Sequence, residues 1–325
     1  MMGMVASVNR KGRTVGEKWG DRHPLGAAAA FFALWIVALV VLTGVFNPIL
    51  VNSFSDNPAS LRLALEVESL ATVVIPATVC PFALGRFGCD ASELRRSAGK
   101  GMGPASEEIA YRDRGESVGF RFAFDSVFRH VGAFVGGLLG GALWFALAFG
   151  ALAALGVATL GVPADVLALP VWIVACAINA TFQEILVRGY AFDAISRGGG
   201  VVAATVITTL VFIAFHPGAF VCGPIAVLQI AAASVLLTVV RIVTGSLAAP
   251  IAMHAAWNAL GGIGFGAVML ANDYPSVFGA TIGGPAWISG GAMGLEGSVV
   301  TLAVTVVLCF AVALFAHMRS YRRGQ

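Results

Sequence analysis

Long uncharged apolar runs alternate with polar segments along this chain, and this pattern predicts its fold. The first run extends from Leu25 to Phe46 and stays apolar to Val51, and a second extends from about Leu63 to Gly85. A helix needs about 20 apolar residues to cross a bilayer, so each run is long enough for one span. The first run is also longer than the apolar core of a signal peptide, and we therefore expect it to be retained.

Further apolar runs follow the polar stretch between Arg86 and Arg129. We expect spans over about 131–164 and 166–200, a fifth that ends at 216–217, and others over 222–240, 246–271 and 297–316. The third span carries Gly132, Gly136 and Gly140, a four-residue spacing of small residues that lets helices approach closely in lipid. The pattern predicts an all-α, polytopic membrane helical bundle of about eight transmembrane helices.

The basic residues set the expected orientation. Lys and Arg gather in the first 24 residues, in the 86–129 loop and after the last span. Because such residues are enriched in cytoplasmic loops, we expect the N and C termini in the cytoplasm and Arg62 on the outer side. The expected units are a basic cytoplasmic N-terminal segment (1–24), the first two spans with the basic loop (25–130), a membrane core (131–317) and a basic cytoplasmic tail (318–325).

Composition narrows the classes of function. Hydrophobic residues make up 58% of the chain and charged residues 11%, whereas soluble domains carry about 25% charged residues. The net charge of +3 is too small to predict a nucleic-acid partner, so the expected environment is the lipid bilayer of the cell membrane. Five scattered cysteines favour buried thiols over a disulfide framework or a zinc knuckle. The H-E-x-x-H and Walker patterns are absent from the sequence.

A small set of polar residues inside the late spans forms the candidate site. The set comprises Glu184, Arg188, His216, His254 and Asn258. Polar groups at bilayer depth are costly and are kept where they are paired or functional. Counting about 1.5 Å of helix rise per residue from the expected turns brings them, apart from Arg188, to a similar layer. Each histidine alone fits a structural role. Because both are expected at the same depth in the membrane as Glu184, a shared site is favoured.

Two imidazoles, a carboxylate and a carboxamide in a low-dielectric cavity suit hydrolysis. Glu184 or His216 could take a proton from water, and a histidine N–H or the Asn258 amide could stabilise the oxyanion on an attacked carbonyl. Alternatively, His216, His254 and Glu184 could hold a divalent metal such as zinc. The first mechanism needs no ion. Glu184 and Arg188 are four residues apart on one helix and are expected to form an ion pair.

At these residues the chain resembles the CPBP intramembrane proteases, bacterial relatives of the type II CAAX prenyl endopeptidases that are also called the Abi family. The family pattern is a Glu-Glu pair with Arg four positions after the second Glu, then Phe with His four later, then His with Asn or Asp four later. The corresponding residues here are Gln183-Glu184 with Arg188, Phe212 with His216, and His254 with Asn258. The resemblance covers about 166–271. It implies that the first Glu and the second motif's histidine activate water, and that the last histidine and Asn shape the oxyanion site.

The chain departs from this pattern at one position. Gln183 stands where the family has its first Glu, and an amide cannot act as a general base. Glu184 lies about 100° further round the helix, so it cannot replace its neighbour without a rotation of the span.

The sequence predicts an intramembrane peptidase that hydrolyses a peptide bond of a membrane-associated protein or peptide. Glu184, His216, His254 and Asn258 are the expected catalytic residues, with Gln183, Arg188 and Phe212 in support. Two alternatives stay open. The cavity could be catalytically inactive, in a membrane scaffold or bacteriocin self-immunity protein, or the buried carboxylate and histidines could serve a proton-coupled transporter.

Overall fold

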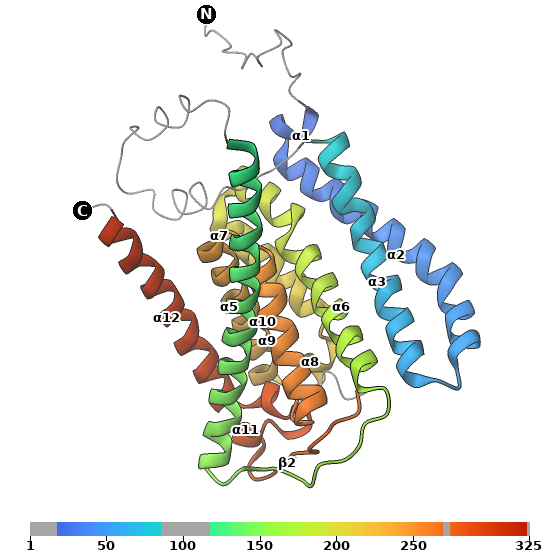
Figure 1. The fold of residues 1–325 in the computed structure, drawn as a ribbon, viewed down its shortest axis with the longest axis vertical. Coiled ribbons are helices and arrows are strands. Elements are labelled where there is room, and N and C mark those ends of the chain that lie inside the picture. Colours follow the sequence, from blue (N-terminus) through green and yellow to red (C-terminus); the bar gives the residue numbers. More distant parts are fainter. Residues whose placement is uncertain (1–17, 86–117, 269–273, 324–325) are drawn as a thin grey trace, which may run out of the picture.

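The computed structural model describes residues 18–85, 118–268 and 274–323, which form a helical bundle (Figure 1). Most of the predicted basic segments, and Cys89, lie outside these residues. The described helices are α1 (Trp19–Arg22), α2 (Pro24–Phe54), α3 (Pro58–Ala83), α5 (Val118–Ala154), α6 (Leu169–Arg188), α7 (Tyr190–Ala214), α8 (Pro217–Cys222), α9 (Pro224–Thr244), α10 (Ala248–Asn258), α11 (Ala286–Ser289) and α12 (Val299–Arg323). Short helical turns are η1 (Ala259–Gly264), η3 (Gly291–Met293) and η4 (Leu295–Gly297), and the strands β1 (Ala158–Thr159) and β2 (Thr281–Ile282) pair antiparallel.

The protein is an all-α, multi-pass membrane protein. Six helical stretches among the described residues are long and apolar enough to cross a bilayer, one of them α6 and α7 taken together. Large apolar side chains such as Val40, Leu139 and Phe310 are exposed on the bundle surface, as expected where lipid is the solvent. The starts of α1 and α5 and the end of α12 lie at one end of the bundle (Figure 1). The count of eight spans and the cytoplasmic position of both termini stay predictions.

The predicted fourth span is wrong at its C-terminal end. α6 ends at Arg188, because Gly189 takes a non-helical conformation (φ −87°, ψ −134°), and α7 begins at Tyr190. A Cβ at position 189 would collide with the carbonyl oxygen of Ile185, so only glycine allows this turn without a shift. The straight helix assumed in counting the depth of Glu184 from the glycine run near Gly200 is therefore not present.

The predicted seventh span is also too long. α10 passes into the π-helical turn η1, which ends at Gly264, well before Ala271. The turn is rich in glycine, and glycine stabilises helices poorly. Single π-helical turns within helices are frequent at functional sites, and this one directly follows Asn258.

Close packing of α5 on α10 uses a different glycine stripe from the one predicted. A Cβ added at Gly137 or Gly141 would collide with the carbonyl oxygens of Ala249 and Met253 on α10. Gly136, which was predicted to make such a contact, faces open space. The four-residue spacing was right, and the register was wrong by one residue. This contact brings α10, which carries His254 and Asn258, against α5.

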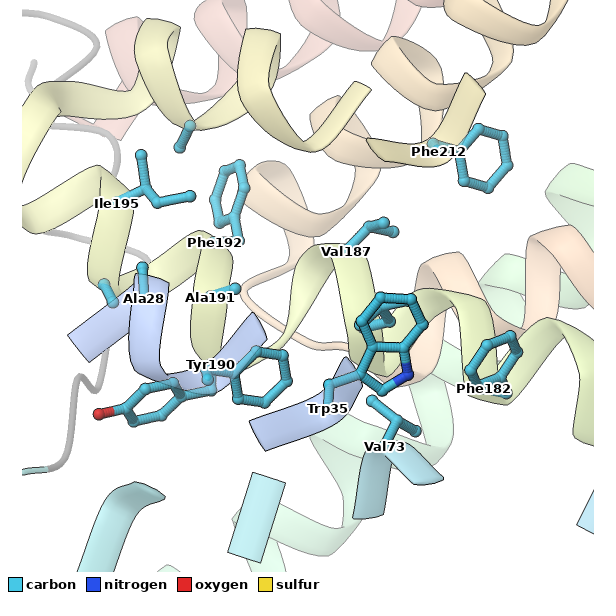
Figure 2. Close-up of a cluster of buried hydrophobic side chains, with 14 of the residues drawn as sticks. Ala28, Trp35, Val73, Phe182, Val187, Tyr190, Ala191, Phe192, Ile195 and Phe212 are labelled. Carbon is cyan, nitrogen blue, oxygen red and sulfur yellow. The ribbon is translucent and has the colours of Figure 1, made fainter. Parts of the chain in front are cut away.

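An apolar core joins the first two long helices to α6 and α7 (Figure 2). Phe31 of α2 stacks on Tyr190 with ring centroids 5.6 Å apart, and Trp35 lies 5.4 Å from Phe215. Val73 of α3 is fully buried in the same core. This packing holds α3 beside α6, so that polar residues of the two helices can meet. The described cysteines are free thiols, namely Cys80, Cys176, Cys222 and Cys309.

Candidate functional site

A cavity of about 590 Å³ lies among α3, α5, α6, α7, α8, α9, α10 and η4. The predicted residues in its lining are Gln183, Phe212, His216, His254 and Asn258. Glu184 and Arg188 are fully buried and do not line it. The structure thus divides the predicted site into a group that faces the cavity and a pair enclosed behind it.

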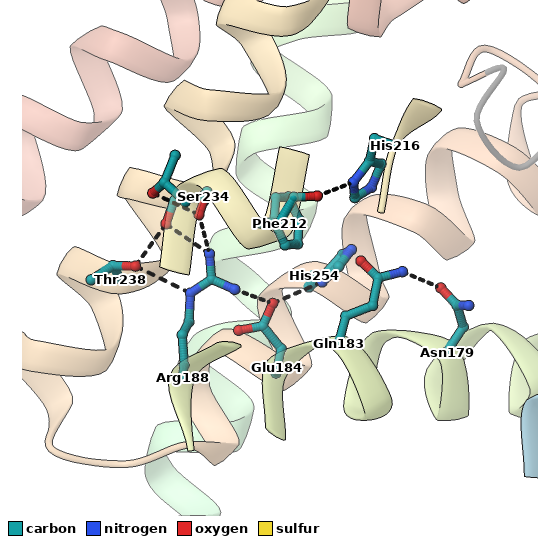
Figure 3. Close-up of polar contacts among 10 residues, drawn as sticks. Asn179, Gln183, Glu184, Arg188, Phe212, His216, Ser234, Thr238 and His254 are labelled. Atoms are coloured by element: carbon teal, nitrogen blue, oxygen red, sulfur yellow. Dashed lines mark hydrogen bonds and ion pairs between the residues drawn. The ribbon is translucent and has the colours of Figure 1, made fainter. Parts of the chain in front are cut away.

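Glu184 is enclosed by hydrogen-bond donors from two helices (Figure 3). Its Oε1 accepts from Arg188 Nη1 at 2.8 Å and from His254 Nδ1 at 2.9 Å. The expected ion pair one helical turn apart is therefore present. A buried carboxylate between two donors of this kind is held in one orientation and links α6 to α10.

Arg188 is satisfied on its remaining sides by α9. Its Nη2 donates to the backbone oxygen of Ser234 at 2.8 Å and to the Ser234 hydroxyl at 2.9 Å, and its Nε donates to Thr238 Oγ1 at 3.2 Å. The guanidinium also lies 5.1 Å from the Phe212 ring centroid. We name Glu184, Arg188, Ser234, Thr238 and His254 the closed cluster. It joins α6, α9 and α10 at the level of the cavity.

The hydrogen bonds of both histidines define their tautomers. His254 Nδ1 faces a carboxylate, and His216 Nδ1 lies 2.8 Å from the backbone oxygen of Phe212. Because both partners only accept, each Nδ1 carries a proton, so the Nε2 atom of each ring is left for other partners. The Phe212 ring lies 4.6 Å from the His216 ring and 5.8 Å from the His254 ring. Both imidazoles therefore pack against one aromatic ring.

A chain of hydrogen bonds from α3 determines how Gln183 is oriented. Asn179 Nδ2 donates to Glu66 Oε2 at 2.9 Å, and Gln183 Nε2 donates to Asn179 Oδ1 at 2.9 Å. A carboxylate can only accept, so the Asn179 amide must turn its nitrogen to Glu66 and its oxygen to Gln183. Gln183 must then turn its own nitrogen to Asn179. Its Oε1, which has no hydrogen-bond partner, lies on the side of His254 (Figure 3).

This arrangement requires an amide at position 183. A glutamate there would place a carboxylate oxygen against Asn179 Oδ1, and turning the Asn179 amide would set its oxygen against Glu66. Either arrangement leaves two acceptors in contact in a partly buried setting, which costs about 1–3 kcal/mol. The amide of Gln183 therefore fits the hydrogen-bond chain formed by Asn179 of α6 and Glu66 of α3.

Asn258 lies one turn beyond His254 on α10. It is half-buried and lines the cavity. Residues four apart lie on one face of a helix, so its carboxamide and the His254 ring share the cavity-facing side of α10.

The predicted metal ligands do not fit a cation. No group of three His, Cys, Asp or Glu side chains in the described ranges is arranged to hold an ion. Glu184 already accepts from Arg188 at 2.8 Å, and the guanidinium would repel a second cation at that carboxylate. His254 uses a proton-bearing nitrogen toward the same oxygen.

Several cavity residues lie outside the three motifs. Arg62 of α3 and Tyr274 line the cavity, and Arg62 Nε donates to Tyr274 OH at 3.1 Å. Arg62 also pairs at 2.7 Å with Glu66, which lies outside the lining. Their four-residue spacing was a signal that an ion pair was present, but nothing in the sequence linked them to Gln183. Gln229 and Glu296 also line the cavity and lie in segments without a motif.

Comparison with known proteins agrees with these motifs. Residues 165–260 match the family described as type II CAAX prenyl endopeptidase Rce1-like. No curated protein and no solved structure matches the chain. The matched segment contains α6, α7, α9 and α10, the helices that carry the closed cluster and the motif residues of the cavity wall. The family match thus confirms, over this segment, the resemblance of the chain to the type II CAAX prenyl endopeptidases.

Proposed function

We propose that this protein is an intramembrane peptidase in which His216 is the general base. The observation that carries this proposal is the commitment of both Nδ1 atoms to acceptors, which leaves the Nε2 atoms of two cavity-lining histidines for chemistry. Of these, His216 has no carboxylate on its other nitrogen and lies where the family pattern has its water-activating histidine. The substrate is a membrane-associated protein or peptide.

The reaction follows from these groups. His216 Nε2 takes a proton from water as the water oxygen attacks the carbonyl carbon of the scissile peptide bond. Asn258 donates an amide N–H to the resulting oxyanion. The C–N bond then breaks, and His216 returns the proton to the leaving amine, so that one water is consumed and two chain ends are produced.

The other predicted residues act as positioning residues in this scheme. Gln183 Oε1 accepts a hydrogen bond from the attacking water or the substrate amide. Glu184 and Arg188 fix the His254 ring, which forms the wall beside the oxyanion. The Phe212 ring packs against both imidazoles, and its backbone oxygen accepts from His216.

The test is cleavage of a peptide library by the purified protein in lipid nanodiscs. His216→Ala should lower the cleavage rate by about 10²–10⁴-fold, and Asn258→Ala by about 10²–10³-fold. The matched control is His130→Ala, because His130 is exposed on α5 and does not line the cavity. Unchanged cleavage in His216→Ala would contradict the proposal.

One observation favours a second candidate, a catalytically inactive scaffold or self-immunity protein. The carboxylate of the first motif is missing at Gln183, and the remaining one is enclosed in the closed cluster. A wild type that binds peptides in the library without cleaving any of them would support this candidate. Absence of both binding and cleavage, with proton-coupled uptake into vesicles, would support the transporter.

A further inference from the structure

A second group of polar and aromatic side chains faces the same cavity. It consists of Gln229 on α9, Glu296 in η4, Trp144 on α5 and Trp257 on α10. None of them belongs to the three motifs, and the proposed reaction does not use them. Contacts join them into one cluster behind which Thr305 of α12 is fully buried.

Hydrogen bonds fix the amide of Gln229. Thr305 Oγ1 donates to the backbone oxygen of Thr301 at 2.8 Å, so its own proton is used. It can therefore only accept from its other partners, Trp144 Nε1 at 2.9 Å and Gln229 Nε2 at 3.1 Å. Gln229 must then present its oxygen elsewhere. This Oε1 has no hydrogen-bond partner, although the residue is only 1% exposed and lines the cavity.

Glu296 adds a carboxylate to the same cluster. It is buried, and its Oε1 accepts from Trp257 Nε1 at 3.4 Å. The Trp257 ring is stacked on the Trp144 ring with centroids 3.9 Å apart. Through these contacts the carboxylate, the Gln229 amide and two indole rings surround one part of the cavity.

The chemistry of this cluster suits a cation. A carboxylate and an amide oxygen accept hydrogen bonds from an ammonium or guanidinium group, and indole faces attract positive charge. Arg62 also lines the cavity and pairs with Glu66 at 2.7 Å. A cation that reaches the cluster meets an acidic and aromatic wall in a setting of low dielectric, where such attraction is strong.

We propose that Glu296, Gln229 and the stacked Trp144–Trp257 pair form a subsite that takes a lysine or arginine side chain of the substrate. This inference rests on the proposed function only in that the ligand is a peptide in the same cavity. It predicts selectivity for substrates with a basic residue near the bond that is cleaved.

The test measures binding rather than cleavage, so that it is independent of the reaction. The His216→Ala protein in zwitterionic nanodiscs is titrated with two apolar peptides that differ only in one lysine or its uncharged isostere norleucine. We expect the lysine peptide to bind about tenfold more tightly, because its ammonium group gains a carboxylate and an aromatic face that norleucine cannot use.

Two variants should remove this preference for different reasons. Glu296→Gln deletes the charge, and Gln229→Leu deletes the amide oxygen but leaves the charge. The control is Glu68→Gln, because Glu68 is a buried carboxylate on α3 outside the cavity lining. Equal binding of the two peptides, no binding of either, or a preference that persists in Glu296→Gln would overturn the subsite. A separate outcome would place Glu296 in the reaction instead. In that case Glu296→Gln, made in the protein that retains His216, would stop cleavage of the norleucine peptide, while the preference for lysine in binding would persist.

Discussion

Gln183 and Glu184 are adjacent in sequence but serve two regions of opposite character. Glu184 is 0% exposed and accepts from two donors in the closed cluster, whereas Gln183 is half-buried on the cavity wall with an unpartnered oxygen. The difference follows from the step of about 100° between consecutive helical residues. Two neighbouring residues of one motif can therefore have different roles, one structural and the other facing the cavity in which a substrate would bind.

The two regions also differ in how they affect stability. The closed cluster holds an enclosed ion pair, and removal of one partner leaves a buried charge uncompensated. The cavity wall is accessible to water, so its polar groups can be replaced at smaller cost. The predictions below separate the regions, beginning with the largest effect.

The largest loss of stability is expected from Arg188→Met. This change leaves Glu184 charged in a buried setting and removes the donors to Ser234 and Thr238, so the free energy of unfolding should fall by about 3–5 kcal/mol. Unfolding in mixed micelles of increasing denaturing detergent measures it. The double variant Glu184→Gln with Arg188→Met should lose less than the single variant, because no buried charge remains. If the double variant lost as much free energy of unfolding as the two single changes added together, the closed cluster would not differ from the cavity wall in the way described.

A smaller loss is expected when the missing carboxylate is restored. Gln183→Glu should lower the free energy of unfolding by about 1–3 kcal/mol, because it brings two acceptors together at Asn179. In a Glu66→Gln background, which already lacks the Arg62–Glu66 pair, Gln183→Glu should cost less, since the Asn179 amide can then turn. We therefore expect a double-mutant cycle of unfolding to show that the double variant is more stable than the sum of the two single changes predicts. Additive losses would show that Glu66 does not orient Gln183 through Asn179.

The smallest effect is expected at the edge of the closed cluster. Thr209 Oγ1 lies 3.0 Å from Ser234 Oγ, and Arg188 already donates to that serine. Thr209→Val should therefore cost about 0.6 kcal/mol, the average for hydrogen bonds between membrane helices. A loss comparable with that of Arg188→Met would extend the closed cluster to α7.

The sequence predicted the local parts of this structure better than the distant ones. The Glu184–Arg188 pair and the shared face of His254 and Asn258 follow from four-residue spacing within one helix. The break at Gly189 was missed because a single glycine within an expected span does not by itself indicate a turn.

Contacts between distant segments lay beyond the reach of periodicity. Asn179 and Glu66 are separated by 113 positions, and only the packing of α3 on α6 brings them together. Glu296 lines the cavity but lies in a glycine-rich segment, in which no hydrophobic periodicity or motif predicted its position. The orientation of Gln183 depends on the first of these contacts, so a motif search alone finds the substitution but not the network that fits it.

The most direct test of this account measures peptide cleavage by the double variant Glu184→Gln with Arg188→Met. The amide oxygen introduced at position 184 could still accept from His254 Nδ1, so the positioning role would survive although the carboxylate is gone. We predict cleavage within about tenfold of wild type, a change of about 1.4 kcal/mol in the barrier, in a sample shown to be folded by its unfolding transition. Cleavage as low as that of His216→Ala in this folded variant would contradict the account and make Glu184 the base.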